Sequence, residues 1–144
     1  MSRPAIDRRE SPLLSVRDLT VDFPIRSGIL GRVNGAVRAV DGVTLELWPG
    51  ETVGLVGESG CGKSTTGRAI LRLLEPTGGR VLFDGQDVGA LDHAGLRALR
   101  RRVQIVFQDP FGSLNPRMSV GAMLEEALKV HSLHQANPRR RVIE

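Results

Sequence analysis

One glycine-rich run constrains this chain more than any other feature of its sequence. The run is Gly57-Glu58-Ser59-Gly60-Cys61-Gly62-Lys63-Ser64-Thr65. A glycine, four further residues and then Gly-Lys-Ser form the pattern of a phosphate-binding loop, provided that a strand precedes it and a helix follows. Residues 52–56 are apolar and residues 66–74 have helical periodicity, so both conditions are met. The sequence therefore predicts a nucleoside triphosphate site rather than a chance glycine-rich turn.

The residue types in this run suit an anion. Gly57, Gly60 and Gly62 can adopt backbone angles that other residues avoid, so successive amide N–H groups can point into one concavity. Such a concavity lies at a helix N-terminus, where unpaired amides and the helix dipole favour negative charge. We expect Lys63 to reach the β- and γ-phosphates and the Ser64 hydroxyl to ligate Mg²⁺.

Composition narrows the class of protein. The 144 residues suffice for one ordinary domain, and the net charge of +4 is carried almost wholly by arginine. The arginines are scattered apart from two short clusters, residues 100–102 and 139–141, and four Phe, one Trp and no Tyr offer little surface for stacking nucleobases. We therefore expect no nucleic-acid partner.

The cysteine content and the N-terminus favour a reducing compartment and no secretion. Cys61 is the single cysteine, so no internal disulfide is possible. Residues 1–12 alternate charge and proline without an apolar core, and we interpret them as a disordered lead rather than a signal peptide. No apolar run approaches the length of a membrane span, which predicts a soluble or peripheral protein.

Residues 13–144 predict an α/β domain. Strands are expected at residues 13–16, 19–23, 37–40, 43–47, 52–56, 80–83 and 103–107. We expect Pro24 to end the second of them, residues 25–36 to form a loop or a long hairpin tip, and Asp41-Gly42 to be a turn. Pro49-Gly50 and Asp84-Gly85 are further predicted turns.

Three helices are expected. The first follows Lys63 and ends at Leu74, before a Pro- and Gly-containing stop. The second is capped by Asp92 and extends through Arg102, and the third is capped by Ser119 and extends to about His131, after a loop at residues 108–118.

These elements predict an antiparallel N-terminal sheet packed on a small parallel core. The strands at residues 52–56 and 103–107 would form that core, with the first helix between the layers. Another helix starts at Asn137-Pro138, only a few residues before Glu144, which is not how a domain normally closes. We therefore expect the domain to be truncated and to expose apolar surface.

Two segments together resemble the ATP-binding subunits of ABC transporters, with a close match to the oligopeptide/dipeptide importer branch. The phosphate loop of that branch is similar to Gly54-Leu55-Val56-Gly57-Glu58-Ser59-Gly60-Cys61-Gly62-Lys63-Ser64-Thr65-Thr66. Its glutamine loop is similar to Phe107-Gln108-Asp109-Pro110-Phe111-Gly112-Ser113-Leu114-Asn115-Pro116-Arg117-Met118. The insertion at residues 25–36 is also similar, and the resemblance covers residues 13–144. It implies the ABC type of P-loop fold, with the start of the helical subdomain after the glutamine loop.

The resemblance implies that ATP and Mg²⁺ are the ligands. Residues 57–65 would wrap the phosphates, and Ser64 and Gln108 would approach Mg²⁺. Gln108 would also lie near the attacking water and connect to the membrane subunits, and Phe23 would stack on adenine. From the residues alone, Gln108 could instead cap backbone groups, and Phe23 could be an ordinary strand residue packed in the sheet.

The resemblance also implies partners and a location. Complete subunits of this kind pair with a second ATP-binding subunit and act on transmembrane permease subunits at the cytoplasmic face of the inner membrane. The solute would be a peptide, nickel or another small solute, and this chain would not contact it.

The chain departs from the family in its catalytic half. The Ser-Gly-Gly signature, the apolar strand ending in Asp-Glu, and the switch histidine do not occur in residues 1–144. The pair Glu125-Glu126 lies in an amphipathic pattern and suits a solvated helix face. We therefore assign no catalytic residue, and whether the chain is an enzyme stays open.

Three alternatives remain beside a fragment of an importer ATPase. One is a truncated module that binds Mg-ATP without hydrolysis or transport. A small P-loop kinase or GTPase would need an Asn-Lys-x-Asp motif, which is absent, or a lid with catalytic arginines. ABC-type DNA-repair or translation proteins share the phosphate loop, but residues 109–118 favour the transporter.

Overall fold

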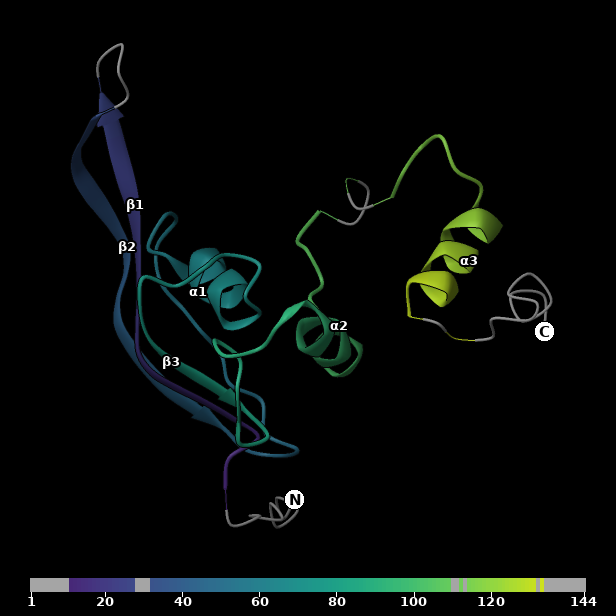
Figure 1. The fold of residues 1–144 in the computed structure, drawn as a ribbon, viewed down its shortest axis with the longest axis horizontal. Helices are drawn as coiled ribbons and strands as arrows, with labels where there is room; N and C mark the ends of the chain where they lie inside the picture. Colours follow the sequence, from purple (N-terminus) through teal and green to yellow (C-terminus); the bar gives the residue numbers. More distant parts are fainter. Residues whose placement is uncertain (1–10, 28–31, 110–111, 113, 132, 134–144) are drawn as a thin grey trace. The chain divides into compact units, whose positions relative to one another are not determined.

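The computed structural model describes residues 11–27, 32–109, 112, 114–131 and 133 (Figure 1). The chain divides into two compact units, residues 1–92 and residues 93–144. Most of the expected disordered lead lies outside the described residues, as does the helix start at residues 137–144.

The first unit is built on an antiparallel four-stranded sheet with the order β2-β1-β3-β4. Its strands are β1 (Leu14–Ser27), β2 (Arg32–Leu47), β3 (Gly78–Phe83) and β4 (Gln86–Asp87). β1 and β2 form a long hairpin, and β3 pairs only with the part of β1 up to Thr20, so the hairpin extends well beyond β3 (Figure 1). The predicted antiparallel part of the fold is therefore confirmed.

The hairpin is longer than the sequence predicted. Pro24 does not end the strand: it pairs with Ala36, and pairing continues to Ser27 and Arg32. Beyond Thr20, β1 pairs with β2 on one side only and has no β3 neighbour on the other. Proline lacks an N–H group, and on the side without a neighbour its absence removes no hydrogen bond. The long-hairpin interpretation of residues 25–36 was right for the strands, and residues 28–31 lie outside the described residues.

Asp41-Gly42 is a bulge rather than a turn. The register moves from Val21↔Val40 to Leu19↔Val43, so β2 carries an extra residue relative to β1. Gly42 has a φ of 61°, the left-handed conformation that such a bulge accommodates in glycine. β2 therefore continues through a segment where the sequence predicted two strands.

A cross-strand ion pair lies beside this bulge. Arg38 Nε donates to Asp22 Oδ1 at 2.9 Å, and Arg38 Nη1 donates to Asp41 Oδ1 at 3.1 Å. The hydrogen bond with Asp22 and the charge of Asp22 raise the pKa of Arg38 above its ordinary value, with Asp41 adding to the effect. Because the pair is exposed, we assign it to strand register rather than to stability.

The predicted turns at Pro49-Gly50 and Asp84-Gly85 are confirmed. The Glu51 amide donates to Trp48 O at 3.0 Å across the first. Asp84 and Gly85 have φ values of 51° and 78°, as a two-residue hairpin between β3 and β4 requires.

Helix α1 (Lys63–Ile70) packs on β1 and β2. The buried residues of α1 are Thr66 and Ala69. The apolar core of the first unit is Val16, Leu19, Val21, Val40, Ala69, Val81 and Val88. Burying a side chain such as Leu or Val stabilises a fold by roughly 1.5–3 kcal/mol, so this small core is what holds α1 on the sheet.

The predicted parallel core does not form within the described part of the chain. Residues 52–56 and 103–107 are not strands there, and Val56 and Val106 are 93% and 94% exposed. A β-prone segment becomes a strand only where a neighbour completes its hydrogen bonds, and no described residue pairs with either segment. The two segments are apolar, as the sequence shows, but the prediction that they form strands is wrong for the described part of the chain.

Two helices lie in the described part of the second unit. α2 (His93–Arg102) has the predicted bounds, with Leu99 buried. α3 (Val120–Val130) begins as predicted, because Ser119 Oγ accepts a hydrogen bond from the Ala122 amide at 3.3 Å. None of the described helices combines the length and the apolar character that crossing a membrane requires.

The exposed apolar segments lead to a prediction about behaviour in solution. The 144-residue chain alone is expected to self-associate and to unfold in a broad transition, because Val53, Leu55, Val56 and Val106 face solvent. Light scattering after size exclusion and a thermal scan would measure this. Val56→Ser removes apolar surface that has almost no packing to lose, so it is expected to raise the monomer fraction. A monodisperse monomer with a cooperative, reversible melt would contradict the prediction.

Candidate phosphate-binding site

The glycine-rich loop joins the exposed segment at residues 52–56 to the first turn of α1. Gly62 is the N-cap residue of α1, with φ 91° and ψ 0°. A Cβ atom at Gly62 would lie 2.3 Å from the Ala39 carbonyl oxygen and 3.8 Å from Val40 Cγ2. The loop therefore rests against the backbone of β2, which holds the start of α1 in place.

The glycines of the loop serve different purposes. Gly60 and Gly62 adopt left-handed angles, φ 84° and 91°, as the sequence predicted. Gly57 was expected to do the same, but it is not among the residues with positive φ. Its requirement is steric, because a Cβ at this position would lie 2.7 Å from Cys61 Sγ. Cys61 thus fills the space beside Gly57.

The Lys63 side chain folds back into the loop. Its Nζ atom donates to Gly57 O at 2.8 Å and to Glu58 O at 2.5 Å, and it lies 3.3 Å from Cys61 Sγ. An ammonium group has three protons to donate, so these three partners use its full capacity. The positive charge is therefore held inside the loop, at the N-terminal end of α1.

The backbone amides around this charge are suited to an anion. Among the described residues, the amides of residues 62–65 donate no hydrogen bond to the chain, whereas the Thr66 amide donates to Gly62 O at 2.8 Å. The buried Thr66 hydroxyl donates to the same oxygen at 3.0 Å and secures the exit of the loop, a role that the sequence did not indicate. Free helix-terminal amides beside an ammonium group fit the phosphates of a nucleotide.

Ser64 lies in the first turn of α1 and is exposed. Gln108 is exposed too, but it belongs to the second unit. The expectation that Ser64 and Gln108 share one Mg²⁺ therefore stays a prediction.

Phe23 lies on the face of the hairpin that adjoins the loop. Val40, which approaches Gly62, pairs with Val21, and paired residues share a face of a sheet. Phe23 follows Val21 by two positions along β1, so alternation along this strand places it on the same side, although the pairing with β2 shifts register between Val21 and Asp22. It is 42% exposed, with the exposed residues Ile25 and Val37 as neighbours on that face, so it is not a core residue. Its stacking on adenine stays a prediction.

The described histidines and acidic residues of the second unit form no cluster that could hold a metal ion. His93 is exposed, and Glu125 pairs with Lys129 at 3.7 Å across one helical turn, as a solvated helix face would. His131 is half-buried, and its buried Nδ1 atom has no hydrogen-bond partner among the described residues.

The chain is similar in sequence to a known protein family and to several curated proteins. The family profile described as ABC transporter matches residues 40–142. The chain is 55% identical over 122 residues to the glutathione import ATP-binding protein GsiA of Escherichia coli strain K12, which covers 85% of this chain and 20% of that protein. The protein of the same name from Pectobacterium atrosepticum has the same identity and coverage. The chain thus spans about a fifth of the length of these curated relatives.

Solved structures with a similar fold are ATP-binding cassettes. A dimeric, post-hydrolysis structure of the cassette MJ0796 bound to ADP and Pi has a TM-score of 0.67 and 26% identity, over 90% of this chain and 54% of the other. A structure of an ATP-binding subunit of an ABC transporter has a TM-score of 0.62 and 28% identity, over 90% of this chain and 47% of the other.

Proposed function

The chain belongs to the ABC transporter family and has the fold of its ATP-binding cassettes, and on that premise we propose that it binds Mg-ATP as part of the energising subunit of a peptide-type importer. The observation that carries the proposal is the arrangement at residues 57–65. There the Lys63 ammonium group lies among unpaired amides at the start of α1. Positive charge and free amides at a helix N-terminus favour an anion, which supports a triphosphate as the ligand.

Within this proposal each residue has a distinct task. The backbone of residues 57–65 surrounds the phosphates, and Lys63 turns from its own loop carbonyls to the phosphate oxygens. Ser64 and Gln108 supply oxygen ligands to Mg²⁺, which neutralises phosphate charge when bound. Phe23 offers an exposed aromatic face to adenine. No residue of this chain is proposed as the base for hydrolysis.

The partners are proposed from the relatives. The relatives are named for glutathione import, and MJ0796 is described as dimeric. We therefore propose a second ATP-binding subunit and transmembrane permease subunits as partners, at the cytoplasmic face of the inner membrane. A small peptide is the proposed class of solute, and the permease rather than this chain would contact it.

A second candidate function is a module that binds Mg-ATP without hydrolysing it. The observation in its favour is the sequence itself, because residues 1–144 hold no Ser-Gly-Gly signature, no strand ending in Asp-Glu and no switch histidine. Phosphoryl transfer depends on several such groups acting together, so residues 1–144 by themselves should bind without turnover.

Titration of the 144-residue chain with Mg-ATP, together with a phosphate-release assay, tests both candidates. We expect saturable binding that weakens when EDTA removes Mg²⁺, and no phosphate release above the rate of buffer. Absence of binding at millimolar Mg-ATP would overturn the proposed site. Phosphate release that disappears in Lys63→Ala would instead rule out the non-hydrolysing module.

A further inference from the structure

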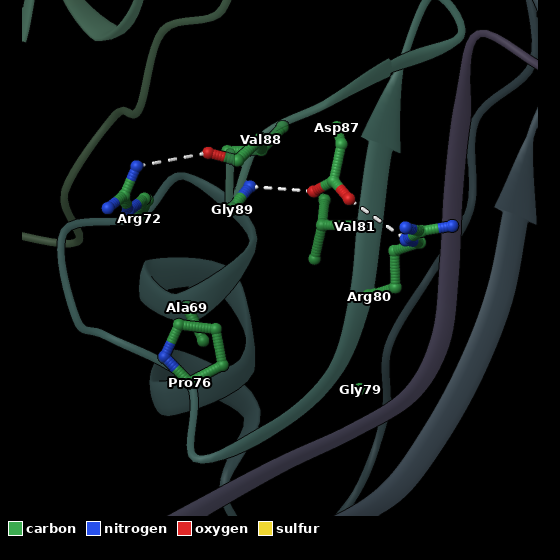
Figure 2. Close-up of a pocket in the computed structure, with 9 residues that line it drawn as sticks. All are labelled: Ala69, Arg72, Pro76, Gly79, Arg80, Val81, Asp87, Val88 and Gly89. Carbon is green, nitrogen blue, oxygen red and sulfur yellow. Dashed lines mark hydrogen bonds and ion pairs between the residues drawn. The ribbon is translucent and has the colours of Figure 1, made fainter. Parts of the chain in front are cut away.

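A pocket of about 310 Å³ lies between the C-terminal end of α1 and the corner that β3 and β4 form (Figure 2). Ala69, Pro76, Val81 and Val88 give it an apolar lining. Two arginines with different partners also line it. Arg80 Nε pairs with Asp87 Oδ2 at 2.8 Å within the sheet, whereas Arg72 reaches from the end of α1 to the segment after β4.

Arg72 connects α1 to residues 88–91. Its Nη1 atom donates to the Leu91 carbonyl at 2.5 Å and to the Val88 carbonyl at 3.2 Å, the latter drawn in Figure 2. Its Nε atom donates to the Glu75 carboxylate at 3.2 Å. The side chain is only 19% exposed, so competition from water is limited. One guanidinium group thus ties together three stretches of the first unit.

The backbone of Arg72 is in an unfavourable conformation. The amides of Arg72 and Leu73 donate to Ala69 O and Arg68 O, which is the Schellman ending of a helix. In this ending the residue at position 72 takes a left-handed angle, here φ 49°, and glycine is the residue that favours it. A large side chain at this position has to offset that cost through its own contacts.

Arg72 also occupies a particular place along the chain. The N-terminal end of α1 carries the phosphate loop, and the C-terminal end carries Arg72. Residues 88–91 then lead directly to His93, where the second unit begins. One helix of 8 residues therefore connects the phosphate loop to Arg72.

We infer that Arg72 is a positioning residue that couples nucleotide occupancy at the first turn of α1 to residues 88–91, the segment from which the second unit starts. The inference rests on the proposed Mg-ATP site. When Lys63 leaves Gly57 O and Glu58 O for a phosphate, the first turn of α1 reorganises, and Arg72 transmits the resulting change to the Val88 and Leu91 carbonyls. Coupling is reciprocal, so Arg72 also contributes to nucleotide affinity.

Hydrogen exchange in the full chain tests this, with and without saturating Mg-ATP. The reporters are the Ala90 and Leu91 amides, which donate to Asp87 O and Val88 O at 3.3 and 3.4 Å. In the unmodified chain we expect Mg-ATP to slow their exchange by roughly fivefold, at the low end of typical couplings. Arg72→Gly removes the guanidinium group while suiting the left-handed backbone, so it is expected to fold, to lose this response and to bind Mg-ATP roughly fivefold more weakly.

Two further variants separate coupling from general stability. Arg80→Gln alters the other arginine of the same pocket, whose ion pair is with Asp87 and not with the Val88 or Leu91 carbonyl, and should keep the full response. Arg72→Lys retains the charge without the guanidinium fork and should restore only part of the response.

The outcomes distinguish the inference from the function on which it depends. Mg-ATP binding with no change in exchange at Ala90 and Leu91, or an unchanged response in Arg72→Gly, overturns the inference and leaves the nucleotide site standing. Absence of Mg-ATP binding in the unmodified chain overturns both.

Discussion

Replacing Lys63 with alanine is expected to abolish most of the Mg-ATP affinity of this chain. The Lys63 ammonium group is the positive charge inside the loop, held by Gly57 O and Glu58 O in the absence of nucleotide. A hydrogen bond to a charged group contributes about 1.5–3 kcal/mol. Its loss corresponds to an increase in Kd of roughly 10- to 100-fold at about 1.4 kcal/mol per factor of ten. Calorimetric titration with Mg-ATP measures this change in Kd.

The chain offers a matched control for this substitution. Lys129 is the other lysine of the sequence, exposed on α3 and paired with Glu125 at 3.7 Å. Lys129→Ala lowers the net charge of the chain by the same amount and should leave the Kd for Mg-ATP unchanged. Circular dichroism of Lys63→Ala should show that α1 persists, because the buried face of α1, Thr66 and Ala69, is untouched. Equal affinity in Lys63→Ala and the unmodified chain would refute the assignment of the loop.

Gly62→Ala is expected to disrupt both the fold of the loop and the nucleotide site. At a φ of 91°, an L-residue meets a conformational cost of about 1–2 kcal/mol. The added Cβ would also lie 2.3 Å from Ala39 O, a backbone atom that cannot rotate away, and overpacking adds about 1–3 kcal/mol. We expect the free energy of unfolding to fall by roughly 2–5 kcal/mol, the sum of these ranges. Denaturant unfolding measures this, and Mg-ATP titration measures the loss of binding.

Gly60→Ala separates the two causes. Gly60 has nearly the same backbone angle, φ 84°, but a Cβ there would meet no atom within 4 Å. Only the conformational cost of about 1–2 kcal/mol should remain. If both substitutions lower the free energy of unfolding equally, the contact between the loop and β2 contributes nothing to stability. The structural role given to Ala39 O would then be wrong.

Local patterns predicted those parts of the chain whose structure depends on neighbours in sequence. The start of α1 at Lys63, the cap at Ser119 and the turn at Asp84-Gly85 all follow from the preferences of a few adjacent residues. The resemblance to ABC ATP-binding subunits also rested on contiguous segments, and the family match confirmed it. For the same reason the phosphate loop was predicted as a unit, down to the left-handed angles of Gly60 and Gly62.

Features that depend on distant partners were predicted poorly. Residues 52–56 and 103–107 have the composition of buried strands, yet no described residue pairs with them. Pro24 and Gly42 both suggested interruptions, but pairing between β1 and β2 carries each strand through them. α1 was expected to continue to Leu74, but it ends at Ile70, because the left-handed backbone at Arg72 closes the helix and its side chain holds the Val88 and Leu91 carbonyls.

The amino-acid sequence was sufficient to specify the family and to predict a phosphate site, because glycine, lysine and serine at fixed spacing define a phosphate loop through local backbone geometry. The tertiary structure alone showed what holds that loop in place. Gly62 rests on Ala39 of β2, Gly57 makes room for Cys61, and Arg72 ties the far end of α1 to residues 88–91. These contacts join residues that are far apart in sequence or depend on exact side-chain positions, and hydrophobic periodicity and turn preferences carry no information about them.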